Sequence, residues 1–549
     1  KLIMILLKKN FLIFFILISA YAFSETSNGV VASRHYLASE VGADILKKGG
    51  NAFDSAIAVG FALAVVNPSA GNIGGGGFTV YSKKNETFAL DYREKAPILS
   101  TENMYLNKEG KVIDGLSLKS YLASGIPGTV AGLIFLHKNE ASMPLKELMN
   151  PAIKLAENGF KLSKFQSGYL NKNKHKFRNT AARKIFVKSG GWKENDLLVQ
   201  KDLAKSLKLI AEEGRKAFYN GNIAKEIVKD FNENGGIFIS EDFLKYEVKV
   251  RKSICGSYRS YEVCSMPPPS SGGIAIIQIL NILENFEIAN YNHNSFEYVD
   301  LLKQAMAHAY ADRSVFLGDS DFFKVPQDEL TSKDYASLLA KNIREGKALT
   351  IKPGTYLEES DETTHFSIID QWGNAVSNTY TLNGAYGSGM VVEGTGILMN
   401  NEMDDFSIKP GHPNLFGLIG AEANKIQPLK RPLSSMSPVI VKKNNIPFLI
   451  TGSPGGSTII NSVLQEILNV IDFKMSLEES SSKSRIHYQW VPDILFHESL
   501  DDNVIEKLEK NMTLRKSKIG EIHSVLYRGN GYKGFSDSRR PDGKSIEIH

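Results

Sequence analysis

A hydroxyl side chain at Thr363 follows a run of charged residues and opens a stretch in which polar and apolar residues alternate. Hydroxyl groups are weak nucleophiles near neutral pH and need an adjacent base. A cut between Glu362 and Thr363 would create that base, because the freed α-amine would belong to the nucleophile itself. An α-amine has a pKa of about 7.7–8.0, closer to neutrality than that of lysine. The pattern therefore predicts a threonine nucleophile that is activated by cleavage of its own chain.

A second hydroxyl is expected beside the first. Residues 363–369 and 375–383 alternate as strands do and flank a turn-like run centred on Trp372. If the hairpin turns there, Thr363 faces Thr381, and directly opposed residues have Cβ atoms about 4.5–5.5 Å apart. A slip of one residue would place the two threonines on opposite faces of the sheet. The register of this hairpin is therefore a strict test of the hypothesis.

The elements around this hairpin predict an α/β fold. Apolar residues at 37, 41 and 45 mark one face of a helix that Gly49-Gly50 would end, and residues 54–66 indicate a buried helix. Amphipathic helices dominate residues 110–350. Strand patterns occur on both sides of that region, at residues 78–81, 447–451 and 525–529. Sheets covered by helices in a layered sandwich are the expected architecture.

Composition excludes some classes of partner. The 549 residues are 42% hydrophobic and 23% charged, with a formal net charge of +5. Residues 1–22 hold three lysines and no acid, which leaves +2 for the remainder. A nearly balanced chain without a dense basic cluster gives no reason to expect nucleic acid as a partner.

The amino-terminal segment has the pattern of a cleaved signal peptide. Lys8 and Lys9 precede an apolar run at residues 11–18, and Ala20-Tyr21-Ala22 follows as a cleavage motif. The run is well below the ~20 apolar residues that a membrane span needs. We therefore expect residues 1–22 to be removed and the protein to be exported to the periplasm or beyond, without a stable membrane anchor.

The two cysteines, Cys255 and Cys264, bracket a segment that could form a hairpin and bring them opposite each other. In an oxidising compartment a disulfide is plausible. The alternative is a pair of small apolar residues in strands, and the sequence does not decide between them. No histidine or further cysteine lies at ligand spacing, so no metal site is expected.

The sequence contains nine short blocks at residues 72–78, 91–97, 126–133, 266–273, 309–313, 363–367, 400–406, 431–438 and 451–457. In this order they resemble those of the bacterial γ-glutamyltransferases, which are N-terminal-nucleophile hydrolases. The resemblance implies a four-layer αββα sandwich formed jointly by two subunits. Self-cleavage between Glu362 and Thr363 would give a large subunit, residues 23–362, and a small one, residues 363–549, which stay associated.

The resemblance also implies a reaction that needs no cofactor. Thr363 would attack a γ-glutamyl amide such as glutathione, and water or the amine of an amino acid or peptide would resolve the acyl-enzyme. Gly455-Gly456 would supply the oxyanion hole, where losing one donor typically costs ~10²–10³ in rate. The alternative for these glycines is a plain turn after Pro454.

A γ-glutamyl group presents a free carboxylate and a free ammonium. The carboxylate fits a guanidinium fork and hydroxyl donors, and by match to the family these are Arg93 with Ser434 and Ser435. The alternative for Arg93 is a structural ion pair with Asp91 or Glu94.

Acceptors for the ammonium would be Glu402 and Asp405, which converge if the segment is locally helical, and the carbonyl of Asn383. The alternative is a solvated acidic turn, which is our expectation for Asp404. In many relatives the loop corresponding to residues 410–417 covers the site and carries an aromatic hydroxyl that bonds the residue at Asn383. Phe416 stands at that position here. Lid closure is therefore expected to be looser, and the balance of hydrolysis and transfer stays open.

The sequence admits other functions. A cephalosporin-type acylase removes glutaryl groups, which lack the ammonium and would leave Glu402 and Asp405 without a purpose. A capsule-polymer transpeptidase is only weakly excluded, and a non-catalytic secreted binding protein would stay uncut.

Residues 74–77 form a glycine run without the Lys-Ser/Thr of a phosphate loop, which indicates tight packing or backbone beside a substrate. His365 shares the face of Thr363, and a structural role is favoured because a free amine makes a second base unnecessary.

Overall fold

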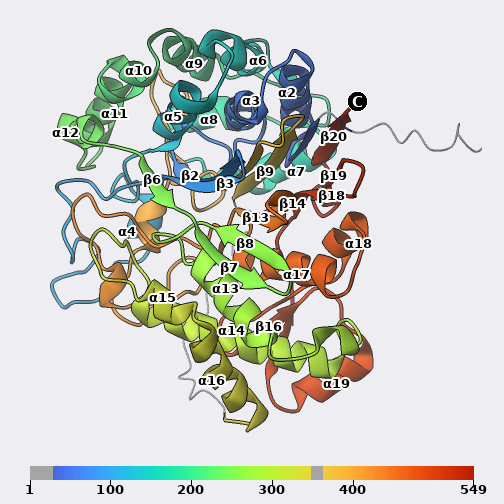
Figure 1. Ribbon diagram of the computed structural model, residues 1–549. Coiled ribbons are helices and arrows are strands. Elements are labelled where there is room, and N and C mark those ends of the chain that lie inside the picture. Colours follow the sequence, from blue (N-terminus) through green and yellow to red (C-terminus); the bar gives the residue numbers. More distant parts are fainter. Residues whose placement is uncertain (1–26, 28, 348–362) are drawn as a thin grey trace, which may run out of the picture.

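Two antiparallel sheets pack face to face, and helices cover both outer faces (Figure 1). The computed structural model describes residue 27, residues 29–347 and residues 363–549. The expected signal peptide at 1–22, the polar segment at 352–362 and Glu362 at the expected cut lie outside the described residues.

The first sheet has seven strands and is buried on both faces. Val31 and Ile368 point into the core beneath the outer helices. Their neighbours Val30 and Ile369 point into the second core, as the alternation of side chains along a strand requires. The strands, in spatial order, are β20 (Lys544–Ile548), β1 (Gly29–Ser33), β9 (Thr364–Asp370), β10 (Ala375–Thr381), β2 (Gly76–Lys83), β3 (Glu86–Tyr92) and β6 (Lys249–Lys252).

The second sheet has six strands and meets the first through hydroxyl groups as well as apolar side chains. The Ser377 hydroxyl donates to the carbonyl of Thr451 at 2.8 Å, and the Ser367 hydroxyl donates to the carbonyl of His523 at 2.9 Å. Its strands, in spatial order, are β19 (Tyr532–Ser536), β18 (His523–Tyr527), β14 (Ile446–Thr451), β13 (Val439–Lys443), β8 (Tyr261–Ser265) and β7 (Ile254–Tyr258).

Two helical layers complete an αββα sandwich, as expected (Figure 1). The layer on the first sheet contains α2 (Tyr36–Lys47), α3 (Ala52–Val66), α5 (Thr129–Glu140), α6 (Leu145–Asn158), α7 (Lys164–Lys172), α8 (Thr180–Phe186), α9 (Lys201–Glu213), α10 (Arg215–Tyr219), α11 (Asn222–Glu233) and α12 (Ser240–Leu244). The layer on the second contains α13 (Gly272–Leu283), α14 (Phe296–Phe316), α16 (Lys333–Arg344), α17 (Ile459–Ile471), α18 (Leu477–Ser482) and α19 (Asp502–Glu509).

Shorter elements connect these layers. They are β4 (Phe160–Lys161), β5 (Leu197–Leu198), β11 (Val391–Val392), β12 (Ile397–Leu398), β15 (Ile486–His487), β16 (Ile494–His497), β17 (Thr513–Lys516), α4 (Leu116–Lys119), α15 (Gln327–Leu330) and the 3₁₀ turns η1 (Lys174–Lys176), η2 (Ile288–Asn290), η3 (Glu402–Asp405), η4 (Glu422–Asn424) and η5 (Gly456–Thr458).

The hairpin that carries Thr363 has the predicted register. Tyr380 pairs with Thr364 and Ala375 with Ile369, so the next pair outward joins Thr363 and Thr381. The second strand is shorter than predicted, because β10 ends at Thr381. Asn383 instead adopts a left-handed conformation with φ +73°, which turns the chain away from the sheet at the site.

The cysteines also lie in a hairpin. Cys255 on β7 is paired with Cys264 on β8, and their sulfur atoms form a disulfide bond. A cross-link between neighbouring strands ties the edge of the second sheet.

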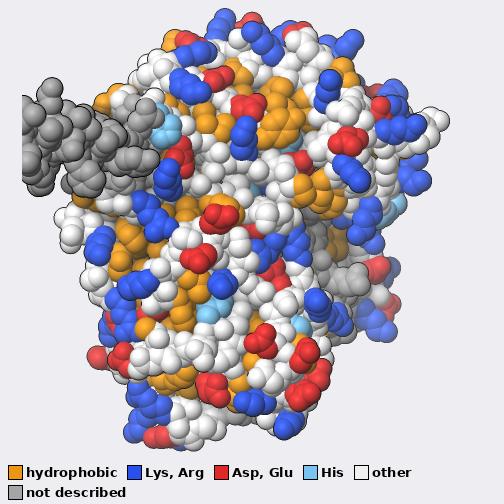
Figure 2. All heavy atoms as spheres, turned by 90° about the vertical axis from the view of Figure 1, so that its right-hand side faces the viewer, with side chains coloured by type: hydrophobic (Ala, Val, Ile, Leu, Met, Phe, Trp, Pro, Cys, Tyr) orange, Lys and Arg blue, Asp and Glu red, His pale blue; other side chains and the backbone are white. Residues whose placement is uncertain are grey.

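Positive and negative side chains are interspersed over the face shown in Figure 2, in keeping with the small net charge. Within the described residues, no helix is long and apolar enough to cross a membrane.

Candidate active site

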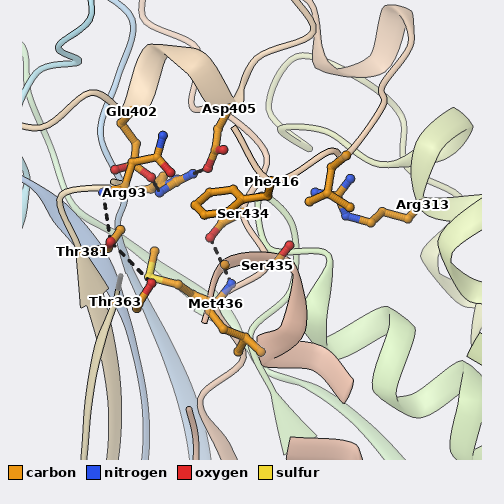
Figure 3. Close-up of a pocket in the computed structure, with 14 residues that line it drawn as sticks. Arg93, Arg313, Thr363, Thr381, Glu402, Asp405, Phe416, Ser434, Ser435 and Met436 are labelled. Carbon is orange, nitrogen blue, oxygen red and sulfur yellow. Dashed lines mark hydrogen bonds and ion pairs between the residues drawn. The ribbon is translucent and has the colours of Figure 1, made fainter. Parts of the chain in front are cut away.

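Thr363 immediately precedes β9 and is almost completely buried. Its hydroxyl lies 3.5 Å from that of Thr381 (Figure 3). The guanidinium of Arg34 donates to the carbonyl oxygen of Thr363 at 2.6 Å, and the same guanidinium is paired with the buried carboxylate of Glu521 at 2.7 Å. This contact fixes the orientation of the peptide group that follows Thr363. It was not predicted, because Arg34 is far from Thr363 in the sequence.

A pocket of about 290 Å³ opens at this hydroxyl. Ten of the site residues predicted from the sequence line this pocket, and some of them are more than 300 positions apart in the chain (Figure 3). Those ten are Arg93, Thr363, Thr381, Asn383, Glu402, Asp405, Phe416, Ser434, Ser435 and Gly456; the lining is completed by Arg313, Leu418, Met436 and Ile459.

Arg93 lies completely buried at the end of β3, where it faces two acids of the pocket. Its guanidinium is paired with Glu402 and, at 2.6 Å, with Asp405. Glu94 is farther away at 3.6 Å, and Asp91 pairs with other arginines of the structure. Arg93 therefore forms its main ion pairs inside the pocket, across the chain, and not with its sequence neighbours.

The acids occupy one short 3₁₀ turn, η3, which directs Glu402 and Asp405 to the same guanidinium, as local helicity predicted. Burial raises the pKa of both carboxyl groups, and Arg93 opposes the shift. Burial also raises the pKa of the neighbouring Glu94, to about 7. A cationic ligand beside these groups would favour their ionised forms.

Our expectation of a solvated Asp404 was wrong. Its side chain is buried, accepts a hydrogen bond from the Ser117 hydroxyl at 2.6 Å, and accepts another from the amide of Leu415 at 2.7 Å. The 3₁₀ turn points this residue inward, between two other segments. Asp404 thereby ties the loop that carries Phe416 to the turn that carries Glu402 and Asp405.

Gly455 and Gly456 lie at the start of η5, just before helix α17. Both have positive φ angles, +129° and +54°, which favour glycine. No hydrogen bond from either amide to a described residue is found. Amides at the start of a helix attract negative charge, so these two are suitable donors for an oxyanion, with Gly456 on the pocket wall.

Phe416 covers this glycine. Its ring lies so close that a Cβ on Gly456 would be 2.3 Å from a ring carbon. The side chain has no hydroxyl, and the Oδ1 atom of Asn383 is buried without a hydrogen-bond partner among the described residues. The Oε2 atom of Glu402 is likewise buried without a hydrogen-bond partner among the described residues. The pocket thus contains two unused acceptors.

Arg313 lines the pocket and was not predicted from the sequence, although it ends the block at residues 309–313. It projects from α14, is buried, and donates from Nε to the Ser271 hydroxyl at 3.1 Å. Its two terminal nitrogens form no hydrogen bond or ion pair with any described residue. Only its spacing from Tyr310, one helical turn away, could have indicated that both face inward.

His365 has contacts that fit a structural role. Its two ring nitrogens lie 2.8 Å from the hydroxyl of Thr379 and 3.0 Å from that of Ser367. Burial holds its pKa well below the ordinary value, so the ring is neutral near pH 7. The ring lies between the two sheets and bridges the neighbouring strands β9 and β10 of the first sheet.

Fold and site together define an enzyme with an N-terminal-nucleophile hydrolase architecture. A family model described as Gamma-glutamyltranspeptidase matches residues 38–546. A curated relative, the "Glutathione hydrolase proenzyme" of Escherichia coli (strain K12), is 47% identical over 528 residues, which cover 94% of this chain and 91% of that protein. The chain belongs to the gamma-glutamyltranspeptidase family, and the resemblance seen in the sequence is confirmed.

Solved structures agree on the fold. Cephalosporin acylase from Bacillus halodurans superposes with a TM-score of 0.84 at 26% identity, covering 95% of this chain and 96% of that chain. A gamma-glutamyltranspeptidase chain from Helicobacter pylori is 49% identical, with a TM-score of 0.56, and covers 56% of this chain and 90% of that chain. The acylase shares the architecture, whereas the transpeptidase is closer in sequence.

Proposed function

We propose that this protein is a periplasmic enzyme that hydrolyses and transfers γ-glutamyl groups of glutathione and related compounds. Self-cleavage between Glu362 and Thr363 would produce subunits 23–362 and 363–549, after removal of residues 1–22. The observation that carries the proposal is one pocket that combines the hydroxyl of Thr363 with the ion-paired cluster of Arg93, Glu402 and Asp405. Both named relatives of the same family support the substrate class.

The charged cluster complements a zwitterion. The α-carboxylate of a γ-glutamyl group would bind Arg93 and the hydroxyls of Ser434 and Ser435, all on the pocket wall. The α-ammonium would bind the unused acceptors, Oδ1 of Asn383 and the second oxygen of Glu402. Buried acceptors without partners cost free energy, so a ligand that supplies donors gains the most at these atoms.

Cleavage comes first in the proposed mechanism. The Thr363 hydroxyl attacks the carbonyl carbon of Glu362, and the peptide nitrogen leaves as the free amine of Thr363 while an ester forms. Water opens that ester and frees the hydroxyl. The new α-amine is then the base that the nucleophile lacked.

Turnover follows the same chemistry on the substrate. The α-amine takes the hydroxyl proton as the oxygen attacks the γ-carbonyl, and the amides of Gly455 and Gly456 stabilise the oxyanion. The amine returns the proton to the leaving nitrogen, and a γ-glutamyl ester on Thr363 remains. Water gives glutamate, whereas an amino acid or peptide amine gives a new γ-glutamyl amide.

A glutaryl acylase is the competing function, since the acylase of Bacillus halodurans has the same fold. A glutaryl group has no ammonium and would leave the acceptors of Asn383 and Glu402 unused. Paired assays with γ-glutamyl and glutaryl anilides separate the two functions, because the leaving group is identical.

The decisive experiment combines a denaturing gel with these assays. Wild-type protein should give two bands and release aniline from the γ-glutamyl substrate, and Thr363→Ala should give one inert band. An active, uncut wild-type chain would refute the mechanism, and a preference for the glutaryl anilide would refute the substrate class.

A further inference from the structure

One cation of the active-site pocket has donors that the protein itself does not use. Arg313 projects from α14 with an exposed fraction of only 5%, and its Nε atom donates to the Ser271 hydroxyl at 3.1 Å. Its two terminal nitrogens have no hydrogen-bond or ion-pair partner among the described residues, although the side chain lines the pocket. Because a buried donor is stabilised by an acceptor, and a charged donor most of all, this guanidinium is suited to an anionic ligand.

The donors of the other arginine in the pocket are already used. The Nε atom of Arg93 donates to the carbonyl of Pro432 at 3.2 Å, and one terminal nitrogen donates to Glu402. The other terminal nitrogen donates to Asp405 at 2.6 Å and to the carbonyl of Leu433 at 3.3 Å. Each nitrogen of Arg93 thus has a partner within the protein. A carboxylate that binds beside Arg93 gains from its charge but competes with these partners for its donors.

Two hydrogen bonds in series tie Arg313 to the serines that we place at the α-carboxylate. The Ser271 hydroxyl, which accepts from Arg313, donates to the carbonyl of Ser434 at 2.8 Å. The Ser271 amide donates to the same carbonyl, also at 2.8 Å. In Figure 3 the Arg313 side chain points from its helix toward Phe416 and Ser435. The guanidinium is therefore held on the side of the pocket that Ser434 and Ser435 form.

Arg313 also lies close enough to Asp405 for each to affect the other. Burial lowers the pKa of the Arg313 guanidinium, whereas Tyr310 and Asp405 raise it. Arg313 in turn lowers the pKa of Asp405, whose ion pair is with Arg93. The two arginines thus influence one carboxylate of the protein from different positions. A ligand carboxylate in the same pocket would be attracted by both of them.

We propose that Arg313 determines specificity for the α-carboxylate of the γ-glutamyl group, which it binds through its two terminal nitrogens beside the hydroxyls of Ser434 and Ser435. This inference rests on the proposed function and deepens it. Arg313 adds the donors that Arg93 uses within the protein, and the paired donors of a guanidinium match the two oxygens of a carboxylate. Ser271 is then a positioning residue, because its hydroxyl holds Nε and leaves the terminal nitrogens for the ligand.

The test compares two donors that differ in one charge. One is a γ-glutamyl anilide, and the other is the same anilide with its α-carboxylate replaced by a carboxamide. The variant is Arg313→Gln, which removes the charge and the paired donors. Arg313→Lys keeps the charge alone. The control is Arg528→Gln, since Arg528 is exposed and does not line the pocket.

Arg313→Gln should lower kcat/KM for the acid donor about tenfold, mainly through KM, because a charge-assisted contact is lost. The carboxamide donor carries a net positive charge that Arg313 repels, so its kcat/KM should not fall. Arg313→Lys should keep most of the wild-type preference for the acid, and Arg528→Gln should keep all of it. An unchanged preference in Arg313→Gln would overturn the inference. So would equal losses for both donors, which a purely structural role predicts.

Ser271→Ala provides the test if Arg313→Gln protein does not give two bands on a denaturing gel. This variant removes the acceptor of the Arg313 Nε atom and changes no residue that lines the pocket. The preference for the acid donor should fall about twofold to fivefold, because the guanidinium is held less firmly. A wild-type preference in Ser271→Ala would then refute the role of Arg313.

Failure of the proposed function would look different. If wild-type protein turned over neither donor, the γ-glutamyl assignment itself would be refuted, and the inference would fall with it. If wild-type protein preferred the acid donor and that preference survived Arg313→Gln, the proposed function would stand and the role of Arg313 alone would be refuted.

Discussion

The two ends of the active-site pocket differ in charge. The reaction end contains the hydroxyls of Thr363 and Thr381 and the glycines at 455 and 456, none of which is charged. The recognition end contains Arg93 and Glu402, both buried, and Asp405, whose side chain is 10% exposed. The recognition end is complete once the chain folds, whereas the proposed reaction end gains its base only when a peptide bond is cut. The proposed mechanism therefore makes folding and activation separable steps, which substitutions can distinguish.

The largest effect is expected at the reaction end, from Thr363→Ala. Loss of the attacking oxygen should abolish cleavage and reduce turnover by at least ~10⁴-fold, as for removal of other catalytic nucleophiles. A denaturing gel and the γ-glutamyl anilide assay measure both. Thr381→Ala is the control: its hydroxyl accepts from the amide of Asn383 at 2.9 Å and lies beside the hydroxyl of Thr363, but it is not the attacking group of the proposed mechanism, so cleavage should persist and turnover should fall less.

Arg93→Lys tests the recognition end. Lysine keeps the charge but loses the fork that reaches both acids and the carbonyls of Pro432 and Leu433. The variant should still be cut into two bands, and kcat/KM should fall ~10²–10³-fold. An uncut Arg93→Lys protein would show that recognition and activation are coupled, which contradicts the separation of the two ends.

Substitution of Arg34 tests whether the α-amine of Thr363, freed by cleavage, acts as the base. Its guanidinium lies against the carbonyl of Thr363, and the titratable groups that interact with it are Glu521, His523 and Asp542. Lys518 and Arg540 lie beside Glu521. A nearby cation favours the neutral form of an amine. In Arg34→Met with Glu521→Gln the pKa of the α-amine should rise, so the acidic limb of the pH–rate profile should move to higher pH. Arg34→Lys should keep the limb in place, even if activity falls; a limb that stays put in the double variant would exclude this influence.

Arg313→Gln should have a moderate effect on recognition. Its charge lowers the pKa of Asp405 and balances the second acid of the pocket. Removing it leaves the site one charge more negative, so KM for γ-glutamyl donors should rise about tenfold with kcat little changed. Arg313→Lys should restore most of the affinity. A fall in kcat with unchanged KM would instead assign Arg313 to the reaction end.

The smallest effect is expected from Phe416→Tyr, at the loop between the two ends. A tyrosine hydroxyl could donate to the unused Oδ1 atom of Asn383 and close the loop more firmly. The ratio of transfer to hydrolysis should rise about twofold to fivefold. Phe416→Leu, which lacks both ring and hydroxyl, should not raise it, and an unchanged ratio in the tyrosine variant would remove this explanation.

Local patterns predicted much of the framework. Helices α2 and α3, strand β14 and the register of the Thr363 hairpin all follow from side-chain periodicity and turn residues. Boundaries were less certain: β18 begins two residues before the predicted strand and ends two residues earlier. The buried Asp404 could not be predicted, because its partners Ser117 and Leu415 lie in other segments.

By itself the sequence determined the family and the pairing of Thr363 with a neighbouring hydroxyl at Thr381, because these depend on short runs of residues and on the spacing within one hairpin. Only the tertiary structure decided that Arg93 pairs with Glu402 and Asp405, that Arg313 joins them, and that Arg34 holds Thr363. Those contacts join residues up to 329 positions apart. The physical reason is that a buried charged group must be paired, and its partner is whichever group the packing of the sheets places beside it. No local sequence pattern identifies that partner.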